Sequence, residues 1–315
     1  MRLSETCKIL SEAYRHKRVL PVLDHLHIEG GYAVAYDGLL ACAVPVQVAF
    51  SCSPHAATFF DAVEVVGDDC SITLDGSNLV LSGKGFNVGV PCTTDPFPMP
   101  DFAATEVLRI PGLLAILHKL APFSTGEDDQ APWKTTIRFA GEVAVATKGP
   151  LLAQVDLPMT VDPFVVPTCV VNVLKAAGGD PDEVRFSPTR FVAAYASGIF
   201  VSAPTVTTPW PDVSKLTAPR RVSTKWTKED FSAVVKLNKF LAKGRVNFRQ
   251  DAVYVHNSAG EESLVALSKC KSNVAVDMDS IRAIANTATL LDIEAPMAYW
   301  EGEGIRGAIR TTAIV

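Results

Sequence analysis

Residues 54–90 read PHAATFFDAVEVVGDDCSITLDGSNLVLSGKGFNVGV, and this stretch decides the fold. Its first part, from Pro54 to Val65, spaces apolar residues as an amphipathic helix does. Behind it, three short segments alternate apolar and polar residues, as half-buried strands do, and the turn sequences DGSN and GKG separate them. The stretch therefore predicts a unit of one helix followed by three antiparallel strands.

The same unit recurs along the 315 residues. Comparable blocks begin near Leu3, Ile110, Pro167, Thr227 and Asp277. In the last two, helices over 228–243 and 277–288 are expected to precede three strands each. Six half-units of roughly fifty residues result, which predicts an α+β architecture of antiparallel sheets packed against helices.

Two proline-rich stretches divide the sequence into thirds. They read TDPFPMPD at 94–101 and TPWPDV at 208–213, and clustered prolines favour extended linkers. Thirds of roughly a hundred residues match ordinary domain size. We therefore expect three similar domains over residues 1–104, 105–217 and 218–315, each containing two half-units.

The charge is unevenly distributed, although the net charge is only −5. Residues 220–250 carry nine Lys and Arg against Glu229 and Asp230, and residues 1–18 carry five against two acids. A chain that is acidic overall but basic in particular segments can meet a polyanion with one face. The alternative is that these cations decorate ordinary solvated helix faces.

The sequence offers no catalytic or metal-binding constellation. The seven cysteines are spread out with no C-x-x-C pair, and His25 and His27 lack a third ligand at suitable spacing. GEGIRG at 302–307 matches a dinucleotide-binding pattern, but no helix can follow it, so a hairpin turn is the expected structure. We expect a non-enzymatic protein without cofactor or metal. The absence of a long apolar run and of a signal peptide predicts a cytoplasmic protein, in the host cytoplasm if it is viral.

Several short motifs resemble the bacterial β sliding clamp, the beta subunit of DNA polymerase III. Four stretches are similar to that family in order and spacing: KRVLPVL at 17–23, AVAYDG at 33–38, VAVATKGPLLA at 143–153 and WPD at 210–212. The resemblance implies the DNA-clamp fold, with the three domains joining partner chains in a ring. Lys148 stands where the family has Asp, and the chain ends without the family's Met-Pro-rich tail. These departures favour a divergent, phage-type member.

The resemblance also implies what the chain binds. A clamp encircles double-stranded DNA without sequence specificity, tethers a DNA polymerase, is placed by a clamp loader, and closes here as a head-to-tail homodimer. Basic residues of the expected helices and their flanks would meet the phosphates: Lys8, Arg15, Lys17, Arg18, Lys119, Lys175, Lys228, Lys236, Lys239, Lys243, Arg245 and Arg282. The family's groove for partner peptides would map to Thr147, Gly149, Leu151, Leu152, Pro219, Ile309 and Thr311, for which plain core packing is the alternative. For the whole chain, the alternative is a regulator or enzyme that has the clamp fold but does not encircle DNA.

Overall fold

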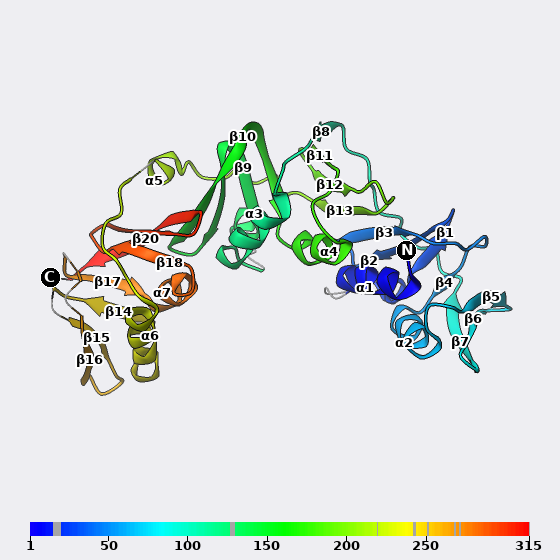
Figure 1. Cartoon of the computed structure of the whole chain (residues 1–315), viewed down its shortest axis with the longest axis horizontal. Helices are drawn as coiled ribbons and strands as arrows, with labels where there is room; N and C mark the ends of the chain where they lie inside the picture. The colour runs from blue at the N-terminus through cyan, green and yellow to red at the C-terminus, as the bar shows by residue number, and fades with distance from the viewer. Residues whose placement is uncertain are drawn as a thin grey trace. The chain divides into compact units, whose positions relative to one another are not determined.

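The computed structural model describes residues 1–14, 20–126, 130–218, 220–241, 244–250, 252–267, 269–270 and 272–314 (Figure 1). The chain forms two compact units. The first comprises Met1–Ala115 and Phe164–Thr207, and the second comprises Ile116–Pro163 and Thr208–Val315. Each unit therefore contains part of the middle third of the sequence.

The first unit is built on a seven-stranded antiparallel sheet in the order β1-β2-β3-β13-β12-β11-β8, beside a small sheet in the order β4-β7-β6-β5. Its elements are α1 (Leu3–Tyr14), β1 (His27–Glu29), β2 (Tyr32–Tyr36), β3 (Ala41–Pro45), β4 (Ser53–Pro54), α2 (Ala56–Val66), β5 (Ser71–Asp75), β6 (Asn78–Gly83), β7 (Phe86–Thr93), β8 (Glu106–Leu108), α4 (Val170–Ala177), β11 (Glu183–Ser187), β12 (Arg190–Ala194) and β13 (Phe200–Pro204). Helix α3 (Leu113–Leu120) runs from the end of this unit into the second.

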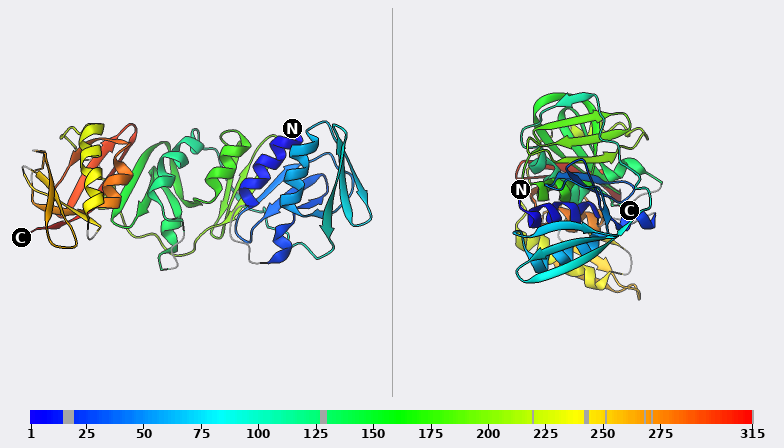
Figure 2. Two further views of the ribbon diagram at one scale, coloured as in Figure 1. Left: turned by 90° about the horizontal axis from the view of Figure 1, so that it is seen from below. Right: turned by 90° about the vertical axis from the view of Figure 1, so that its right-hand side faces the viewer.

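The helices α1 and α4 pack against each other and against one face of the seven-stranded sheet (Figure 1). Leu10 of α1 and Leu174 of α4 are fully buried there, and α2 lies beside α1 (Figure 2). Burying apolar side chains between helix and sheet is the main source of stability in such a layered unit. The opposite face of α1 and α4 remains exposed.

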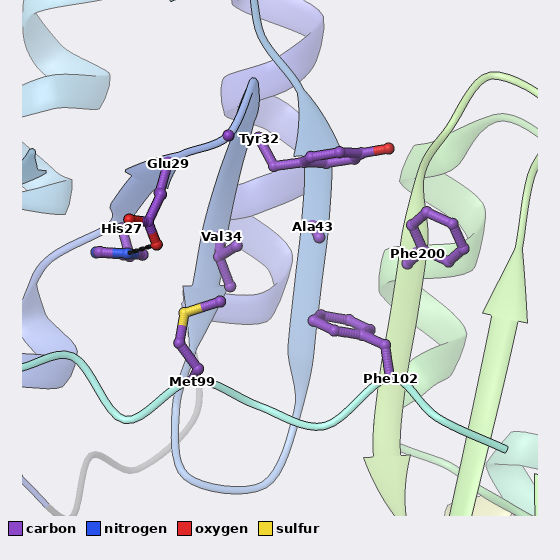
Figure 3. Close-up of a pocket in the computed structure, with 9 residues that line it drawn as sticks. His27, Glu29, Tyr32, Val34, Ala43, Met99, Phe102 and Phe200 are labelled. Carbon is purple, nitrogen blue, oxygen red and sulfur yellow. Dashed lines mark hydrogen bonds and ion pairs between the residues drawn. The ribbon is translucent and has the colours of Figure 1, made fainter. Parts of the chain in front are cut away.

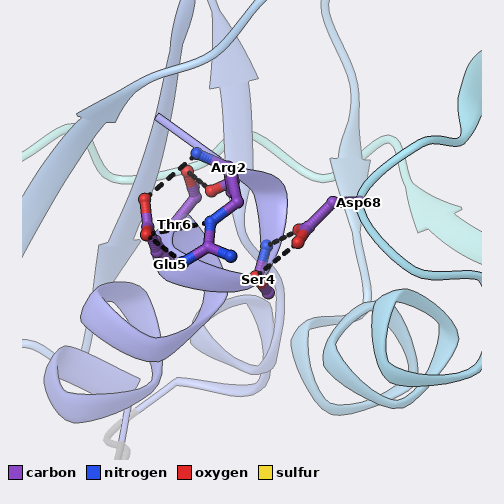
Figure 4. A network of polar contacts seen from close by, with 5 residues as sticks. All are labelled: Arg2, Ser4, Glu5, Thr6 and Asp68. Atoms are coloured by element: carbon purple, nitrogen blue, oxygen red, sulfur yellow. Dashed lines mark hydrogen bonds and ion pairs between the residues drawn. The ribbon is translucent and has the colours of Figure 1, made fainter.

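Asp68 joins the two halves of the first third of the chain. The backbone amide of Ser4 donates to Asp68 Oδ1 at 2.7 Å, and the Ser4 hydroxyl donates to Oδ2 at 2.9 Å (Figure 4). The amides of a first helical turn have no partner within the helix, so a carboxylate there stabilises it. Asp68, which follows α2, thus caps α1.

The second unit has a sheet in the order β16-β15-β14-β17-β20-β10-β9, with β19 pairing β20 and β18 pairing β19. Its elements are η2 (Ala121–Phe123), η3 (Pro132–Thr135), β9 (Thr136–Lys148), β10 (Leu151–Pro167), α5 (Ser214–Thr217), α6 (Lys228–Lys236), η4 (Leu237–Phe240), β14 (Arg245–Phe248), β15 (Ala252–His256), β16 (Glu262–Ala266), β17 (Val274–Asp277), α7 (Met278–Ile284), β18 (Ala288–Asp292), β19 (Met297–Gly302) and β20 (Ile305–Ala313), where η marks a 3₁₀ helix. Helices α6 and α7 pack against each other (Figure 2).

The half-unit pattern expected from the sequence is confirmed. A helix precedes three strands in five of the six blocks. In the remaining block, α3 is followed by two long strands, β9 and β10. The turn sequences at 75–78 and 83–86 close the β5–β6 and β6–β7 hairpins, and residues 302–305 close the β19–β20 hairpin. Short-range turn chemistry and period-two alternation are local signals, which explains why they could be found in the sequence.

Two helices are shorter than expected. The helix predicted over 228–243 ends at Lys236 and continues as the 3₁₀ helix η4 to Phe240, while Ala242 and Lys243 lie outside the described residues. The helix predicted over 277–288 ends at Ile284, because β18 begins at Ala288. Helix ends commonly tighten into 3₁₀ geometry, where the carbonyl groups lack α-helical partners.

The sheets continue across both proline-rich linkers. In the first unit, β3 of the first third pairs with β13 of the middle third; in the second, β10 of the middle third pairs with β20 of the last. The division into domains 1–104, 105–217 and 218–315 stays a prediction. No described helix is long and apolar enough to cross a membrane.

Candidate nucleic-acid interface and partner groove

The helices of the first unit present isolated cations to solvent. Thr6, Cys7 and Leu10 hold α1 against the core, whereas Lys8 is exposed. Lys175 is likewise exposed on α4, whose Val173 and Leu174 are buried. Because α1 and α4 pack together, Lys8 and Lys175 belong to adjacent helices. Arg15, Lys17 and Arg18, which the sequence also assigned to DNA, lie outside the described residues.

Helix α6 carries the helix face that the sequence predicted to be the most basic. Its N-terminus is fixed by a capping box, in which Asp230 N donates to Thr227 Oγ1 at 3.2 Å and Thr227 N donates to Asp230 Oδ2 at 2.7 Å. Phe231 is buried on one side, while Lys228 and Lys236 are exposed on the other. Lys239 is exposed too, but it lies on η4. The basic face therefore continues beyond the α-helix.

Asp230, the carboxylate at the start of α6, forms an ion pair with a lysine from another part of the second unit. Asp230 pairs with Lys269 Nζ, which also donates to Lys225 O at 3.1 Å. Burial raises the pKa of Asp230, but the hydrogen bonds from Lys269 and Thr227 outweigh it and keep the pKa below the usual value. Asp230 is thus ionised and paired, and does not neutralise Lys228 or Lys236.

A cavity of about 600 Å³ lies between α3, α6 and the end of α7 in the second unit. It is lined by Lys119, Lys228 and His118, together with the apolar residues Phe123 and Trp226. Lys119 Nζ donates to the carbonyl oxygen of Glu303 at 3.2 Å, on the β19–β20 turn. The structure therefore brings together two of the predicted cations, Lys119 and Lys228, from separate thirds of the sequence. His118 was not among the predicted residues.

Two further predicted cations have different surroundings. Arg282 on α7 is exposed and donates to Asp279 Oδ1 at 2.8 Å, so its charge is largely balanced within its own helix. Arg245 is exposed but lies on β14, opposite Asp277 of β17, and not on a helix. Arg282 and Arg245 are therefore exposed, but neither lies on α6 with Lys228 and Lys236.

The residues predicted for the partner groove lie mainly inside the sheet of the second unit. Leu151 and Ile309 are paired across β10 and β20 and are both buried, as is Leu152. Thr147 Oγ1 donates to Leu151 O at 2.9 Å, closing the β9–β10 turn. Gly149, in that turn, adopts a φ of +58°. These contacts fit the core-packing alternative as well as a groove wall.

The other two residues predicted for the partner groove are Thr311 and Pro219. Thr311 is buried on β20, where its hydroxyl donates to Glu294 O at 2.7 Å. Pro219 lies outside the described residues.

A small cavity of about 10 Å³ lies next to these strands, beside the linker that follows Trp210-Pro211-Asp212. It is lined by Gln154, Leu216, Ala218, Arg220, Val222, Tyr299, Trp300, Arg306 and Gly307, none of which the sequence assigned to the partner groove. The Arg220 guanidinium lies over the Tyr299 ring at 4.2 Å and pairs with Glu294 at 3.1 Å. Arg220 thus covers this cavity, which a local sequence motif could not reveal.

Comparisons by sequence give no match: no protein-family model and no curated protein matches the chain. Solved structures match it over its whole length. A DNA polymerase sliding clamp from Pseudomonas aeruginosa is 12% identical, with coverage of 100% of this chain and 99% of that one and a TM-score of 0.80. For the DNA polymerase III beta subunit of Thermotoga maritima the identity is 15%, the coverage 100% and 98%, and the TM-score 0.78.

The chain has the DNA sliding-clamp fold. A third similar structure, the Helicobacter pylori beta clamp bound to a DNA ligase peptide, is 13% identical, with coverage of 99% and 98% and a TM-score of 0.71. The fold implied by KRVLPVL, AVAYDG, VAVATKGPLLA and WPD is therefore confirmed. At these identities the property shared with the solved clamps is the fold.

The edges of this clamp fold carry exposed apolar side chains. Strand β16 is the last strand of its sheet, with Leu264 61% exposed and Phe240 of the neighbouring η4 51% exposed. In the first unit, β7 pairs with β4 only at Cys92 and Thr93, and Phe86 at its start is 54% exposed. Unpaired strand edges with apolar side chains can accept a further strand.

The described residues include no group of three or more His, Cys, Asp or Glu that could hold a metal ion. Of the two histidines considered in the sequence, His27 is half-buried: its Nδ1 lies 3.0 Å from Ser53 Oγ, and its ring stacks on Phe97. His25 contacts His55 edge-on, with ring centroids 5.4 Å apart. Neither histidine is fully exposed, because Phe97 of the linker at 94–101 covers His27 and His55 contacts His25.

Proposed function

We propose that this chain is a sliding clamp that encircles double-stranded DNA and tethers a DNA polymerase without catalysing a reaction. The observation that carries the proposal is the placement of lysines on exposed faces of the helices in a chain of net charge −5. These residues are Lys8, Lys119, Lys175, Lys228 and Lys236. Contacts of this kind attract phosphates without reading bases, which suits a protein that must slide.

The proposed ring is a head-to-tail homodimer. Strand β16 of one copy would extend the β7 edge of the other, with Leu264 and Phe240 meeting Phe86. This pairing would satisfy unpaired backbone groups at both edges and remove exposed apolar surface. Because the two edges belong to different units of the chain, two copies joined in this way would make two identical interfaces and close without a free edge.

The proposed partner site lies beside β10 and β20. The Helicobacter pylori clamp with this fold binds a DNA ligase peptide, and here the linker residues around Arg220 and the strand residue Tyr299 border a cavity next to the predicted groove residues. Polymerase and clamp-loader peptides would enter by displacing Arg220 from Tyr299. Short peptides commonly bind such sites through one or two apolar anchors.

The deciding experiment separates topological linkage from surface binding. The protein is loaded on nicked circular DNA with a clamp loader and ATP, washed at moderately high salt, and the DNA is then linearised. A clamp survives the wash on circles and is lost on linearisation, because salt weakens phosphate contacts but not linkage. Equal retention on circular and linear DNA would show surface binding instead. No retention would favour a regulator or enzyme with this fold that does not encircle DNA.

A further inference from the structure

The first unit contains an open apolar pocket that neither DNA binding nor the proposed partner groove uses. Its volume is about 400 Å³, within the range of sites that bind small ligands or peptide side chains. It is lined by His27, Glu29, Gly30, Tyr32, Val34, Ala43, Met99, Phe102 and Phe200 (Figure 3). All of these residues belong to the first unit.

The floor of the pocket is set by strand register. Val34 of β2 is paired with Ala43 of β3, and Ala43 is paired with Phe200 of β13, so the three residues form one row across the sheet. Tyr32 stands two residues before Val34 and therefore shares its face. Small Ala43 between two larger neighbours leaves the hollow, and a sheet holds it open without a ligand.

The wall of the pocket is the proline-rich linker, which is pinned on both sides of Met99. At one end the Phe97 ring stacks on His27, with centroids 5.2 Å apart. At the other, Ser202 Oγ donates to Asp101 O at 2.7 Å, and Phe102 packs edge-on against Phe200. Between these points Met99 is 56% exposed (Figure 3). A flexible thioether held over a pocket can adapt to different apolar side chains.

One carboxylate, Glu29, lines the pocket. Glu29, paired with Tyr32 across the β1–β2 hairpin, has a 60% exposed side chain and contacts His27 Nε2 at 3.3 Å. An apolar ligand with a neighbouring positive charge would therefore place its apolar part among Tyr32, Phe102 and Phe200 and its cation beside Glu29.

The pocket also occupies the same position in its unit as the Arg220-covered cavity in the other. Each lies where strands from two successive thirds of the chain pair. In the first unit these are β3 and β13, beside linker 94–101; in the second they are β20 and β10, beside the residues that follow linker 208–213. In the second unit Gln154 and Arg306 are the paired residues at this position, and the cavity is only about 10 Å³. Of the two, the first unit's pocket is open.

We propose that the pocket formed by Tyr32, Ala43, Met99, Phe102 and Phe200 is a second docking site, for a partner peptide with an aromatic or long aliphatic anchor followed by a basic residue. Peptide binding at this site needs neither ring closure nor DNA. It is measured on the free protein, so its failure and the failure of the clamp function are separate results.

The test uses a model peptide in which Phe-Leu-Arg is flanked by Gly and Ser, and a matched peptide with Glu in place of Arg. Methyl NMR of the methionines reports the site directly, because Met99 lines the pocket and Met297 lies on β19 near Tyr299. We expect a saturable shift of the Met99 methyl signal and no shift at Met297. The Glu-containing peptide should bind about threefold or more weakly, since it repels Glu29.

Three variants complete the test. Met99→Asp, which lacks the methyl probe and is therefore followed by fluorescence anisotropy of the labelled peptide, should bind it about tenfold more weakly because a charge enters the apolar contact. Glu29→Gln should weaken it by about two- to fivefold and remove the preference for Arg over Glu. Val107→Asp is the matched control, because Val107 is also in the first unit and 58% exposed but lies on the distant edge strand β8; it should bind as the unaltered protein does. An unchanged far-UV circular dichroism spectrum and slow modification of the buried Cys7 thiol, which belongs to the first unit, show that each variant is folded.

Four results would overturn the proposal. A peptide that shifts Met297 in place of Met99 binds the cavity of the second unit. If Met99→Asp leaves the peptide affinity unchanged, the peptide does not bind in this pocket. The same conclusion follows if the Met99 methyl signal does not shift at millimolar peptide. If Met99→Asp alters the sedimentation of the free protein while Val107→Asp does not, the pocket is covered by a second copy of the chain.

Discussion

The Trp300 indole lies directly against Gly307, on the neighbouring strand of the β19–β20 hairpin. A Cβ atom at position 307 would come within 2.7 Å of Trp300 Nε1 and 2.0 Å of the Leu152 carbonyl oxygen. Trp300 is fully buried and stacks on Phe123, with centroids 5.4 Å apart, so it cannot move aside. The absence of a side chain at Gly307 is what lets β20 pair with β10 beneath the indole.

Gly307→Ala should therefore destabilise the second unit by about 3 kcal/mol, the upper range for forcing an extra carbon into a packed core. Tryptophan fluorescence during denaturant unfolding measures this, because Trp133, Trp210, Trp226 and Trp300 all belong to the second unit. Gly126→Ala is the control: a Cβ there meets no atom within 4 Å. An unchanged fluorescence midpoint for Gly307→Ala would contradict the close packing.

The first unit should be unaffected by Gly307→Ala, and its thiols can report this. Six of the seven cysteines lie in the first unit, and burial raises the pKa of both Cys7 and Cys169 to about 12. A protonated, buried thiol reacts only when its surroundings open. We expect Gly307→Ala to leave the rate of thiol modification unchanged at denaturant concentrations where tryptophan fluorescence has already shifted. Equal acceleration of both signals would show that the two units unfold together.

Lys228 and Lys236 should contribute to DNA affinity through salt-dependent contacts. Replacing either with Gln should lower the slope of log K against log salt concentration by about 0.9, the value for one phosphate contact on duplex DNA. Fluorescence anisotropy of a labelled duplex over a salt series measures the slope. Lys84→Gln, in the turn between β6 and β7, is the matched control and should leave the slope unchanged. If the three variants behave alike, these helix cations are ordinary solvated charges.

The sequence predicted those features that depend on neighbouring residues. The half-units, the turns DGSN and GKG and the hairpin at 302–307 follow from periodicity and turn chemistry, which act over a few positions. Pairing between distant segments left no such signal. Nothing near Ala43 indicates that it lies opposite Phe200, and nothing near Arg220 indicates that it covers Tyr299. Both cavities beside the linkers were missed for this reason.

The cations predicted to contact DNA show the same difference between local signals and contacts of distant segments. Helical spacing placed Lys228 and Lys236 correctly on one exposed face, because Phe231 and Val234 define the buried side of α6. It could not show that the helix ends before Lys239, since the ending depends on how η4 packs on β15 and β16. Helical spacing also could not predict that Lys119 and Lys228 line the same cavity, because this depends on the tertiary fold.

Asp68 should make the first unit more stable at neutral than at acid pH. The hydrogen bonds from the Ser4 backbone and hydroxyl lower the pKa of Asp68. A carboxyl group whose pKa is lowered by folding stabilises the folded state above its unfolded pKa of about 4 and loses this effect as the pH falls through the folded value. Asp68→Asn should thus be less stable than the unaltered protein at pH 7, with the difference shrinking below about pH 4.

Thermal unfolding followed by far-UV circular dichroism measures this difference over a pH series. Asp69→Asn is the control, since the neighbouring Asp69 is also exposed while Ser4 donates to Asp68. An Asp68→Asn variant whose stability deficit stays constant from pH 7 to pH 3 would show that the carboxylate does not act through its ionised form.

The exposed side chains at the two strand edges should decide whether the chain dimerises. Leu264→Asp on β16 and Phe86→Asp on β7 each place a carboxylate where the proposed interface excludes water, and each changes both interfaces of a two-chain ring. Losing one buried apolar side chain costs about 2 kcal/mol per interface, and the unpaired charge adds to this. We expect dimer dissociation constants at least about a hundredfold higher, measured by sedimentation equilibrium. Val107→Asp, on the separate edge strand β8 and equally exposed, should dimerise normally. A Leu264→Asp protein that remains dimeric would exclude β16 from the interface, because an aspartate could not be tolerated at the centre of a dry strand edge.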